Sequence, residues 1–294
     1  MDKKTLADTS IAGPALTPFR GSLAMAWTGT DGAGRLNVAT GLEFDDFTKV
    51  TLDEFSITRP ALATFNGRLY LAWVGTDGGD LLNLASSADG VTFDQKVTLN
   101  ERSAFGPSLR ADFGRLYLAW TGTDGENHLN LAQSRDGRSL ENKITYGETL
   151  TGGPALTTNE TSGGEELVFI AWTGTDNPHH INFAQGFSPG FENSYVKYVY
   201  DGSTEGIGPD ASTTGPALVY NPGQFATFLS YIGNGGDGRL FVLGSGENTE
   251  PPDFRRMLNE SSIDTPALAA APGIGTWLAW TGTDGQGHLN LAQV

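Results

Sequence analysis

The chain has 294 residues with 34 acidic against 18 basic side chains, a formal net charge of −16, and no cysteine. Without cysteine, disulfides and thiolate metal sites are excluded. A surface this negative repels phosphate backbones and anionic lipid, so we expect neither nucleic acid nor membrane insertion. The 40 glycines predict many turns, and therefore many short strands.

The chain begins with a short predicted strand, Lys3-Lys-Thr-Leu6, and shows no apolar segment typical of a secretory signal. No apolar run approaches the roughly 18 residues of a membrane helix. We therefore expect a soluble protein, and its secretion or display at the cell surface is favoured over a cytoplasmic location.

From residue 14 onward, one unit of about 47 residues recurs six times. Each copy opens on Pro-[Ala/Ser]-Leu, and these openings begin at Pro14, Pro60, Pro107, Pro154, Pro216 and Pro266. A Trp-[Thr/Val]-Gly-Thr-Asp segment follows in five copies, and the other copy has Tyr231-Ile-Gly-Asn-Gly235. An internal repeat of this length is typical of propellers and solenoids.

The second copy predicts four antiparallel strands per unit. Ala61–Phe65 is apolar, and Asn66-Gly67 is a strong hairpin signal before Arg68–Trp73. A polar loop then leads to Leu81–Ser87, and a last turn leads to Phe93–Leu99. Both faces of the second strand are apolar, as expected for a sheet between two neighbouring sheets.

The last repeat stops at Val294, after its third strand. The missing fourth strand is supplied by the N-terminus, because Lys3-Lys-Thr-Leu6 matches Lys96-Val-Thr-Leu99 and the register continues to Pro14 against Pro107. This exchange leaves no sheet edge exposed and favours a closed ring over a solenoid. The sequence thus predicts an all-β, six-bladed β-propeller in one domain, residues 1–294, with blades at about 11–54, 55–102, 103–149, 150–203, 204–260 and 261–294 plus 1–10.

Two blades depart from the pattern. Blade five lacks the tryptophan, carries an insertion at residues 201–214 and has Glu250-Pro-Pro252 near its last turn, and blade four has an insertion at 160–165. If the repeated loop serves folding alone, blade five requires a compensating arrangement.

Ser87-Ala-Asp-Gly-Val-Thr-Phe93 resembles the Asp-box of sialidase-type propellers, and Ser134-Arg-Asp-Gly-Arg-Ser-Leu140 is a weaker copy. The repeat-built layout is also similar to that of bacterial and fungal propeller lectins. In sialidases, the box braces the hairpin between the third and fourth strands, and three arginines bind a carboxylate. Arg59-Pro60 lies where the resemblance places the first of these arginines, but the equivalent positions elsewhere hold glycine or threonine. We therefore expect Arg59 to be a surface residue that forms salt bridges.

The loops that join the second and third strands (B–C loops) share one face of a propeller with the crossovers between blades (D–A crossovers), and this face is where we place the site. The ninth position of the loop, counted from the tryptophan, is polar in five of six copies. A tryptophan offers a flat face to a sugar, and Asp, Arg and His bind hydroxyls. The predicted ligand-binding residues are Trp27, Asp31, Arg35, Trp73, Asp77, Trp120, Asp124, His128, Trp172, Asp176, His180, Trp280, Asp284 and His288.

A structural interpretation of the same loop stays open. The tryptophan can pack between blades, the Asp can brace the turn, and the Asn after the ninth position can hold the loop. Adjacent His179 and His180 point in opposite directions on a strand and cannot bind one metal ion there. No cofactor is expected, although calcium remains a possible ligand of the Asp-Gly loops.

The sequence favours a multivalent lectin-like module without catalysis, for example the targeting component of a secreted toxin or enzyme, whose partners are glycans or glycoproteins. The alternatives are a divergent sialidase-like glycoside hydrolase and a protein-interaction scaffold. The sequence specifies neither the sugar nor the oligomeric state.

Overall fold

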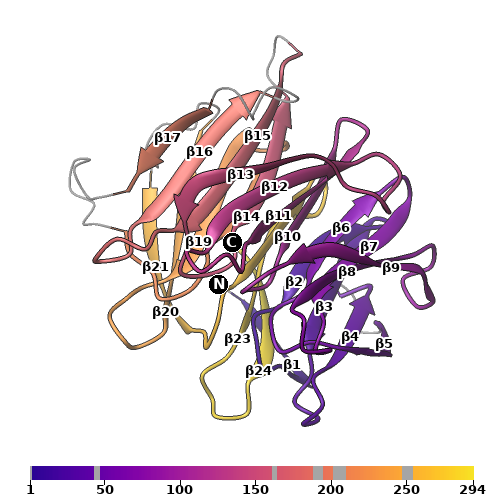
Figure 1. Ribbon diagram of the computed structural model, residues 1–294. Coiled ribbons are helices and arrows are strands. Elements are labelled where there is room, and N and C mark those ends of the chain that lie inside the picture. Colours follow the sequence, from indigo (N-terminus) through magenta and orange to yellow (C-terminus); the bar gives the residue numbers. More distant parts are fainter. Residues whose placement is uncertain (1, 43–46, 161–163, 188–194, 201–209, 247–253) are drawn as a thin grey trace.

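The computed structural model describes the chain apart from residues 1, 43–46, 161–163, 188–194, 201–209 and 247–253. The described residues form six antiparallel sheets of four strands, each in the order of the chain except the last. This arrangement confirms the predicted six-bladed propeller (Figure 1). Parts of the predicted insertions, at 161–163 and 201–209, and the Glu250–Pro252 stretch lie outside the described residues.

Within a blade, the four strands lie side by side, the first nearest the ring centre and the fourth outermost. Blade one contains β2 (Ala15–Phe19), β3 (Ser22–Thr28), β4 (Arg35–Thr40) and β5 (Thr48–Phe55). Blade two contains β6 (Ala61–Phe65), β7 (Arg68–Val74), β8 (Leu81–Ser87) and β9 (Phe93–Arg102). Blade three contains β10 (Ser108–Asp112), β11 (Arg115–Thr121), β12 (His128–Ser134) and β13 (Glu141–Thr149).

The second half repeats this order. Blade four contains β14 (Ala155–Glu160), β15 (Glu166–Thr173), β16 (Ile181–Phe187) and β17 (Tyr195–Val199). Blade five contains β18 (Ala217–Asn221), β19 (Ala226–Ile232), β20 (Arg239–Ser245) and β21 (Phe254–Ser261). Blade six contains β22 (Ala267–Ala271), β23 (Gly275–Thr281), β24 (His288–Gln293) and, from the other end of the chain, β1 (Lys3–Thr9).

The ring closes through β1, as the sequence predicts. This strand pairs antiparallel with β24, Lys3 opposite Ala292 and Thr5 opposite Asn290, so the first residues form the outer edge of the last blade. The two termini accordingly lie close together (Figure 1). The third strand of the last blade, β24, is therefore paired on both sides rather than left as an open edge.

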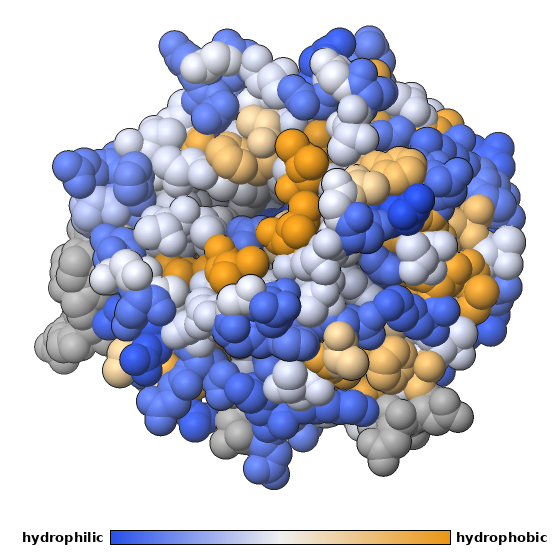
Figure 2. Space-filling view, turned by 90° about the horizontal axis from the view of Figure 1, so that it is seen from below, coloured by the Kyte–Doolittle hydropathy of each residue, from blue (hydrophilic) through white to orange (hydrophobic). Residues whose placement is uncertain are grey.

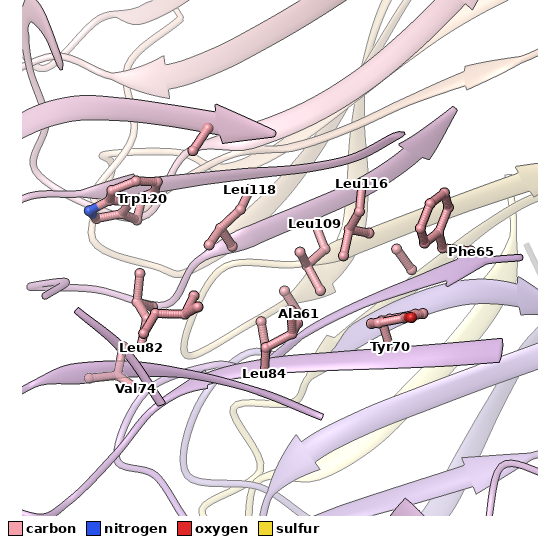
Figure 3. Close-up of a cluster of buried hydrophobic side chains, with 14 residues drawn as sticks. Ala61, Phe65, Tyr70, Val74, Leu82, Leu84, Leu109, Leu116, Leu118 and Trp120 are labelled. Carbon is pink, nitrogen blue, oxygen red and sulfur yellow. The ribbon is translucent and has the colours of Figure 1, made fainter. Parts of the chain in front are cut away.

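The core consists of six clusters, one at each junction between neighbouring blades. At the junction of blades two and three, Trp120 belongs to one buried cluster with Leu82 and Leu84 of β8 (Figure 3). Every other junction repeats the arrangement, with the Trp of one blade, or Tyr231 in blade five, against the third strand of the preceding blade. Side chains alternate between two neighbours along β7, with Leu69, Leu71 and Trp73 in the cluster shared with blade one and Tyr70, Ala72 and Val74 in the cluster shared with blade three. This alternation explains why both faces of the second strand are apolar.

The innermost strands begin in near contact at the ring centre. A Cβ added to Gly153 would lie 2.2 Å from the carbonyl oxygen of Gly106, and one added to Gly215 would lie 2.1 Å from that of Gly153. Since no side chain fits at this distance, glycine before the repeated proline reflects close backbone approach. In the described part of the chain, no helix is long and apolar enough to span a membrane.

Candidate functional site

The B–C loops share one turn, and its aspartate braces the backbone. Asp31 Oδ1 accepts the N–H groups of Ala33 (3.1 Å) and Gly34 (2.8 Å), and Asp284 Oδ1 accepts those of Gln286 (3.0 Å) and Gly287 (2.8 Å). These bonds hold the turn that follows the tryptophan. The aspartate thus has a structural function in addition to any contact with a ligand.

The second carboxylate oxygen binds the basic side chain at the ninth position. His128 Nδ1 lies 2.7 Å from Asp124 Oδ2, His288 Nδ1 lies 2.6 Å from Asp284 Oδ2, and Arg35 Nη1 donates to Asp31 Oδ2 at 3.0 Å. Blade four has the same contact between its own two residues, Asp176 and His180. We call these four contacts the Asp–basic pairs: Asp31–Arg35, Asp124–His128, Asp176–His180 and Asp284–His288.

Three of the pairs lower the pKa of their carboxylate, those of Asp31, Asp124 and Asp284. The hydrogen bond from His288, with those from the backbone, lowers the pKa of Asp284 to about 2. For Asp124, desolvation would raise the pKa, but the bonds from His128 and the loop backbone lower it overall. The pKa of Asp31 is lowered in the same way, against desolvation, by the backbone and side chain of Arg35.

Blades two and five lack this pair. In blade two, Asp77 Oδ1 accepts only the Gly79 N–H at 3.2 Å, the ninth residue is Leu81, and Arg102 donates to the Gly79 carbonyl instead. In blade five, Arg239 Nε lies 3.4 Å from Asp237 Oδ2, two residues away rather than four. The candidate site is therefore repeated in four blades out of six.

The start of the following D–A crossover is hydrogen-bonded to the B–C loop, at the residue just before the ninth position. The backbone places them together, because Ser10 N donates to the Gly287 carbonyl at 2.9 Å and Ser56 N donates to the Gly34 carbonyl at 3.0 Å. Ile11 and Ile57 come next in the chain and are 46% and 71% exposed. Arg35 and His288 thus each lie next to a crossover that carries an exposed isoleucine. Blade five, which lacks the pair, has the same feature, because Ile263 is 48% exposed and follows Ser262, whose N–H donates to the Gly238 carbonyl.

The loops joining β3 to β4 and β23 to β24 lie at the lower edge of Figure 1, and Figure 2 views the molecule from that side. Hydrophilic atoms cover most of the rim of this face. Hydrophobic atoms lie beside the hollow at its centre. The face therefore offers polar and apolar surface next to each other.

The tryptophans do not contribute to this surface. Trp27, Trp73, Trp120, Trp172 and Trp280 are at most 1% exposed. One side of Trp120 packs on the preceding blade, and the ammonium of Lys143 lies 5.4 Å from its ring centroid. Because these indole faces are covered, our expectation that they present a flat surface to a sugar does not fit the structure, and the packing interpretation does.

The Thr and Asn of the motif also hold the loop in place. Thr121 Oγ1 donates to the Gly152 carbonyl (2.8 Å) in the crossover to the next blade. Asn130 Nδ2 donates to the His128 carbonyl (3.0 Å), and Asn130 Oδ1 accepts from Thr145 (2.6 Å) on β13. Equivalent Asn contacts to the outer strand occur in blades one, two and six. These buried bonds fix the base of the loop on which the Asp–basic pair stands.

The turns between the third and fourth strands carry the residues on which the Asp-box resemblance rests. Ser87 Oγ donates to Asp89 Oδ1 (2.9 Å) and accepts from Gly90 N (2.8 Å), and Asp89 Oδ1 also accepts from Thr92 N (2.7 Å). Asp136 repeats these contacts in blade three. The backbone bonds from Thr92 and Val91 hold the pKa of Asp89 far below its usual range. These turns lie at the opposite ends of the strands from the B–C loops.

Arg59 is not the surface ion-pairing residue that we expected. Its side chain packs against Gly106 and Gly153 at the ring centre, and Nη2 donates to the Pro154 carbonyl at 2.8 Å, so it spans from blade two to blade four. No carboxylate among the described residues forms an ion pair with it. Arg59 can reach the ring centre because the glycines at the equivalent positions of the other blades leave the space that its long side chain fills.

In the described part of the chain, no group of three or more His, Asp or Glu side chains lies close enough together to hold a metal ion. His179 Nδ1 lies 3.1 Å from the Gly174 carbonyl, whereas His180 contacts Asp176. The two neighbouring imidazoles therefore have separate partners.

No protein-family model matches this chain, and no curated protein sequence matches it. Solved structures are similar to it. The SapL1 lectin, solved with alpha-methyl fucoside, aligns over 97% of this chain and 93% of its own, with a TM-score of 0.66 and 11% identity. A mutant of AofleA from Arthrobotrys oligospora aligns over 99% and 86%, with a TM-score of 0.64 and 11% identity.

A sialidase from Trypanosoma rangeli, solved with sialic acid, aligns over 99% of this chain but 58% of its own, with a TM-score of 0.65 and 9% identity. At such identities the likeness concerns the fold alone. The resemblance of this propeller to lectin and sialidase propellers is thus confirmed as an architectural one.

Proposed function

We propose that this chain is a multivalent carbohydrate-binding propeller without catalysis, which binds glycans or glycoproteins through its Asp–basic pairs. The observation that carries the proposal is the recurrence of one exposed polar pair at the same place in four blades. Folding alone does not require the ninth side chain, since blade two has Leu81 there and keeps the same loop.

Each histidine pair suits hydroxyl recognition. The carboxylate bonded to Nδ1 fixes the orientation of the imidazole. In blade three, Nε2 of His128 also lies 3.5 Å from the exposed Glu126 carboxylate, so a sugar hydroxyl would bind between these two groups. A ring held in this way loses little conformational freedom when a sugar binds. In the Arg35 and His288 sites, Ile57 and Ile11 add an apolar surface for the C–H groups of a sugar, the part we first assigned to tryptophan.

Repetition turns weak sites into useful affinity. Several sites on one rigid ring can engage a branched or clustered glycan together, and overall affinity then rises by roughly 10² or more when the geometry allows. Structural similarity to the SapL1 lectin, whose structure holds a fucoside, supports a sugar as the ligand class. Such a module would act outside the cell or at the cell surface, for example as the targeting part of a toxin or enzyme.

A sialidase-like hydrolase is the second candidate, and the central channel argues against it. Glycoside hydrolysis generally needs two carboxyl groups on either side of the scissile bond. Among the described residues, those lining the channel include no Asp or Glu. Nor is there a cluster of three arginines in that lining.

A glycan array tests the proposal, run on the whole chain with and without calcium. We expect binding to defined glycans and its loss, by at least tenfold in apparent affinity, when His128, His180 and His288 are all replaced by Ala. His179→Ala is the matched control, because this histidine is also exposed but bonds to backbone, and it should leave binding unchanged.

Three results would contradict the proposal. Binding that survives the triple replacement would move the site elsewhere. Hydrolysis of a fluorogenic glycoside, abolished by one carboxylate mutation, would favour the enzyme. A response to no glycan at all, together with a specific protein partner, would favour the scaffold.

A further inference from the structure

A cavity of about 420 Å³ runs along the axis of the ring. The innermost strands of all six blades line it, and most of the lining side chains are alanine, leucine and proline. A concave apolar site with a few placed polar groups is the usual form of a small-molecule site. This channel is separate from the Asp–basic pairs on the rim.

The charge of the channel is opposite to that of the protein. The chain has 34 acidic and 18 basic residues, yet the described residues of the lining include two arginines, Arg59 and Arg110, and no carboxylate. A guanidinium stays protonated in proteins, so both carry their charge into apolar surroundings. Asp264 and Asp112 act on these two arginines from outside the lining, so it is the lining itself that is complementary to an anion.

Arg110 is oriented by a hydrogen-bonded chain. Its Nε donates to Thr158 Oγ1 at 2.9 Å on the neighbouring blade, and Thr158 Oγ1 donates to Asp112 Oδ2 at 2.6 Å. No described residue bonds to its two terminal nitrogens. Burial lowers the pKa of Arg110 and the charge of Asp112 raises it, but the group stays cationic. At the same level of the other five blades stand uncharged residues: Thr17, Ala63, Thr157, Val219 and Ala269.

Arg59 limits the channel at the other end. It bonds to the Pro154 carbonyl, whereas Arg110 reaches Thr158, four residues further along the same innermost strand of blade four. At about 3.3 Å per residue, the two contacts are roughly 13 Å apart. The apolar walls between them have room for a compact organic group.

We propose that the central channel binds a small organic anion, a carboxylate with a compact apolar body. Its carboxylate accepts from the terminal nitrogens of Arg110, and its apolar part lies against the leucines and alanines of the innermost strands. Charge-assisted bonds from guanidinium to carboxylate are among the strongest in proteins. Arg59 closes the D–A end above the ligand.

Isothermal titration calorimetry with benzoate tests this site, and benzyl alcohol serves as the neutral probe of similar size. We expect one benzoate per chain and at least tenfold weaker binding of the alcohol. Arg110→Met should weaken benzoate binding by roughly tenfold to a hundredfold, the loss of one or two charge-assisted bonds. Arg138→Met, at an exposed arginine outside the channel, is the matched control.

A second variant covers the case in which Arg110→Met does not fold. Ala111→Leu fills part of the lining without removing a polar group, and it should weaken benzoate and benzyl alcohol alike. The proposal is wrong if benzoate does not bind at millimolar concentration, if the alcohol binds equally well, or if Arg110→Met and Ala111→Leu bind benzoate as the parent does. Glycan binding by the rim is measured separately, so failure of either proposal leaves the other intact.

Discussion

Blades three and five place different residues in the same space between blades. In blade three, Trp120 is buried, Lys143 lies over its ring, and Asn130 bonds to Thr145 on the outer strand. Blade five has the corresponding residues Tyr231, Arg255, Phe241 and Met257. Tyr231 and Phe241 stack with centroids 5.2 Å apart, and the guanidinium of Arg255 lies 4.5 Å from the Phe241 centroid.

The exchange in blade five includes a new polar centre. Tyr231 donates to the buried carboxylate of Asp210, whose Oδ1 lies 2.8 Å from Arg255 Nε. The sequence left open whether blade five would need compensation for its missing tryptophan, and this centre is that compensation. The comparison teaches that the inner positions of the repeat serve packing and change as a set. The outer Asp–basic pair is instead replaced by unrelated contacts, from Arg102 to the Gly79 carbonyl in blade two and between Arg239 and Asp237 in blade five.

The largest expected effect comes from removing the cation of blade five. Arg255→Met leaves the Asp210 carboxylate, whose side chain is 3% exposed, without its charge partner, and should cost about 3 kcal/mol of unfolding free energy. Burial already raises the pKa of Asp210 against the bonds from Tyr231 and Arg255. A raised pKa means that stability is retained at low pH and lost as pH rises, so the variant should be less impaired at pH 5 than at pH 8.

Urea denaturation at both pH values measures this effect. Lys143→Met is the matched control, because it removes the equivalent cation of blade three, whose ion pair with Glu101 is exposed and worth at most about 1 kcal/mol. Equal losses for the two variants, or a loss independent of pH, would show that Asp210 and Arg255 do not form the buried centre described above.

A smaller loss is expected when the residue of blade five is moved alone into blade three. Trp120→Tyr leaves a void between blades and buries a hydroxyl without the acid and arginine that serve Tyr231, so we expect about 2 kcal/mol of destabilisation. Trp277→Tyr is the control, since Trp277 is only partly buried and lies outside the motif. If the control loses as much stability as Trp120→Tyr, the idea that these positions change as a set is wrong.

The fold could be predicted from the sequence because its information is repeated. Six copies of Pro-[Ala/Ser]-Leu and five of the Trp motif define the unit, and the match of residues 3–6 to residues 96–99 predicts the pairing of β1 with β24. Local turn signals such as Asn66-Gly67 then place the strand ends, and Asn66 indeed has φ of 48°. Repetition compensates for the weakness of each single signal.

The site was harder to predict because a strand-end residue can face either of two surroundings. Tryptophan at the end of β11 is equally consistent with an open stacking surface and with a junction between blades, and only the position of the preceding blade decides between them. The exposed Ile57 was overlooked, although Ser-Ile recurs at residues 10–11, 56–57 and 262–263, because no motif links the crossover to the ninth position of the loop. Arg59 and Arg110 were misassigned or overlooked because contacts across a ring centre join blades far apart in sequence.

The smallest expected effect concerns the opposite ends of the strands, where Asp89 braces the turn of blade two. Its pKa is far below the usual range because Thr92 N and Val91 N donate to the ionised carboxylate. A depressed pKa contributes stability that is fully present above about pH 4, the pKa of an unfolded aspartate, and is lost as pH falls further. Asp89→Asn keeps an acceptor oxygen but no charge, so the parent should be the more stable of the two at pH 7 and should lose that advantage progressively as pH falls below about 4. Urea midpoints across this range measure the difference, with Asp53→Asn, at an exposed residue of β5, as the control; a difference that stays constant down to pH 2 would mean that the charge of Asp89 does not stabilise the turn.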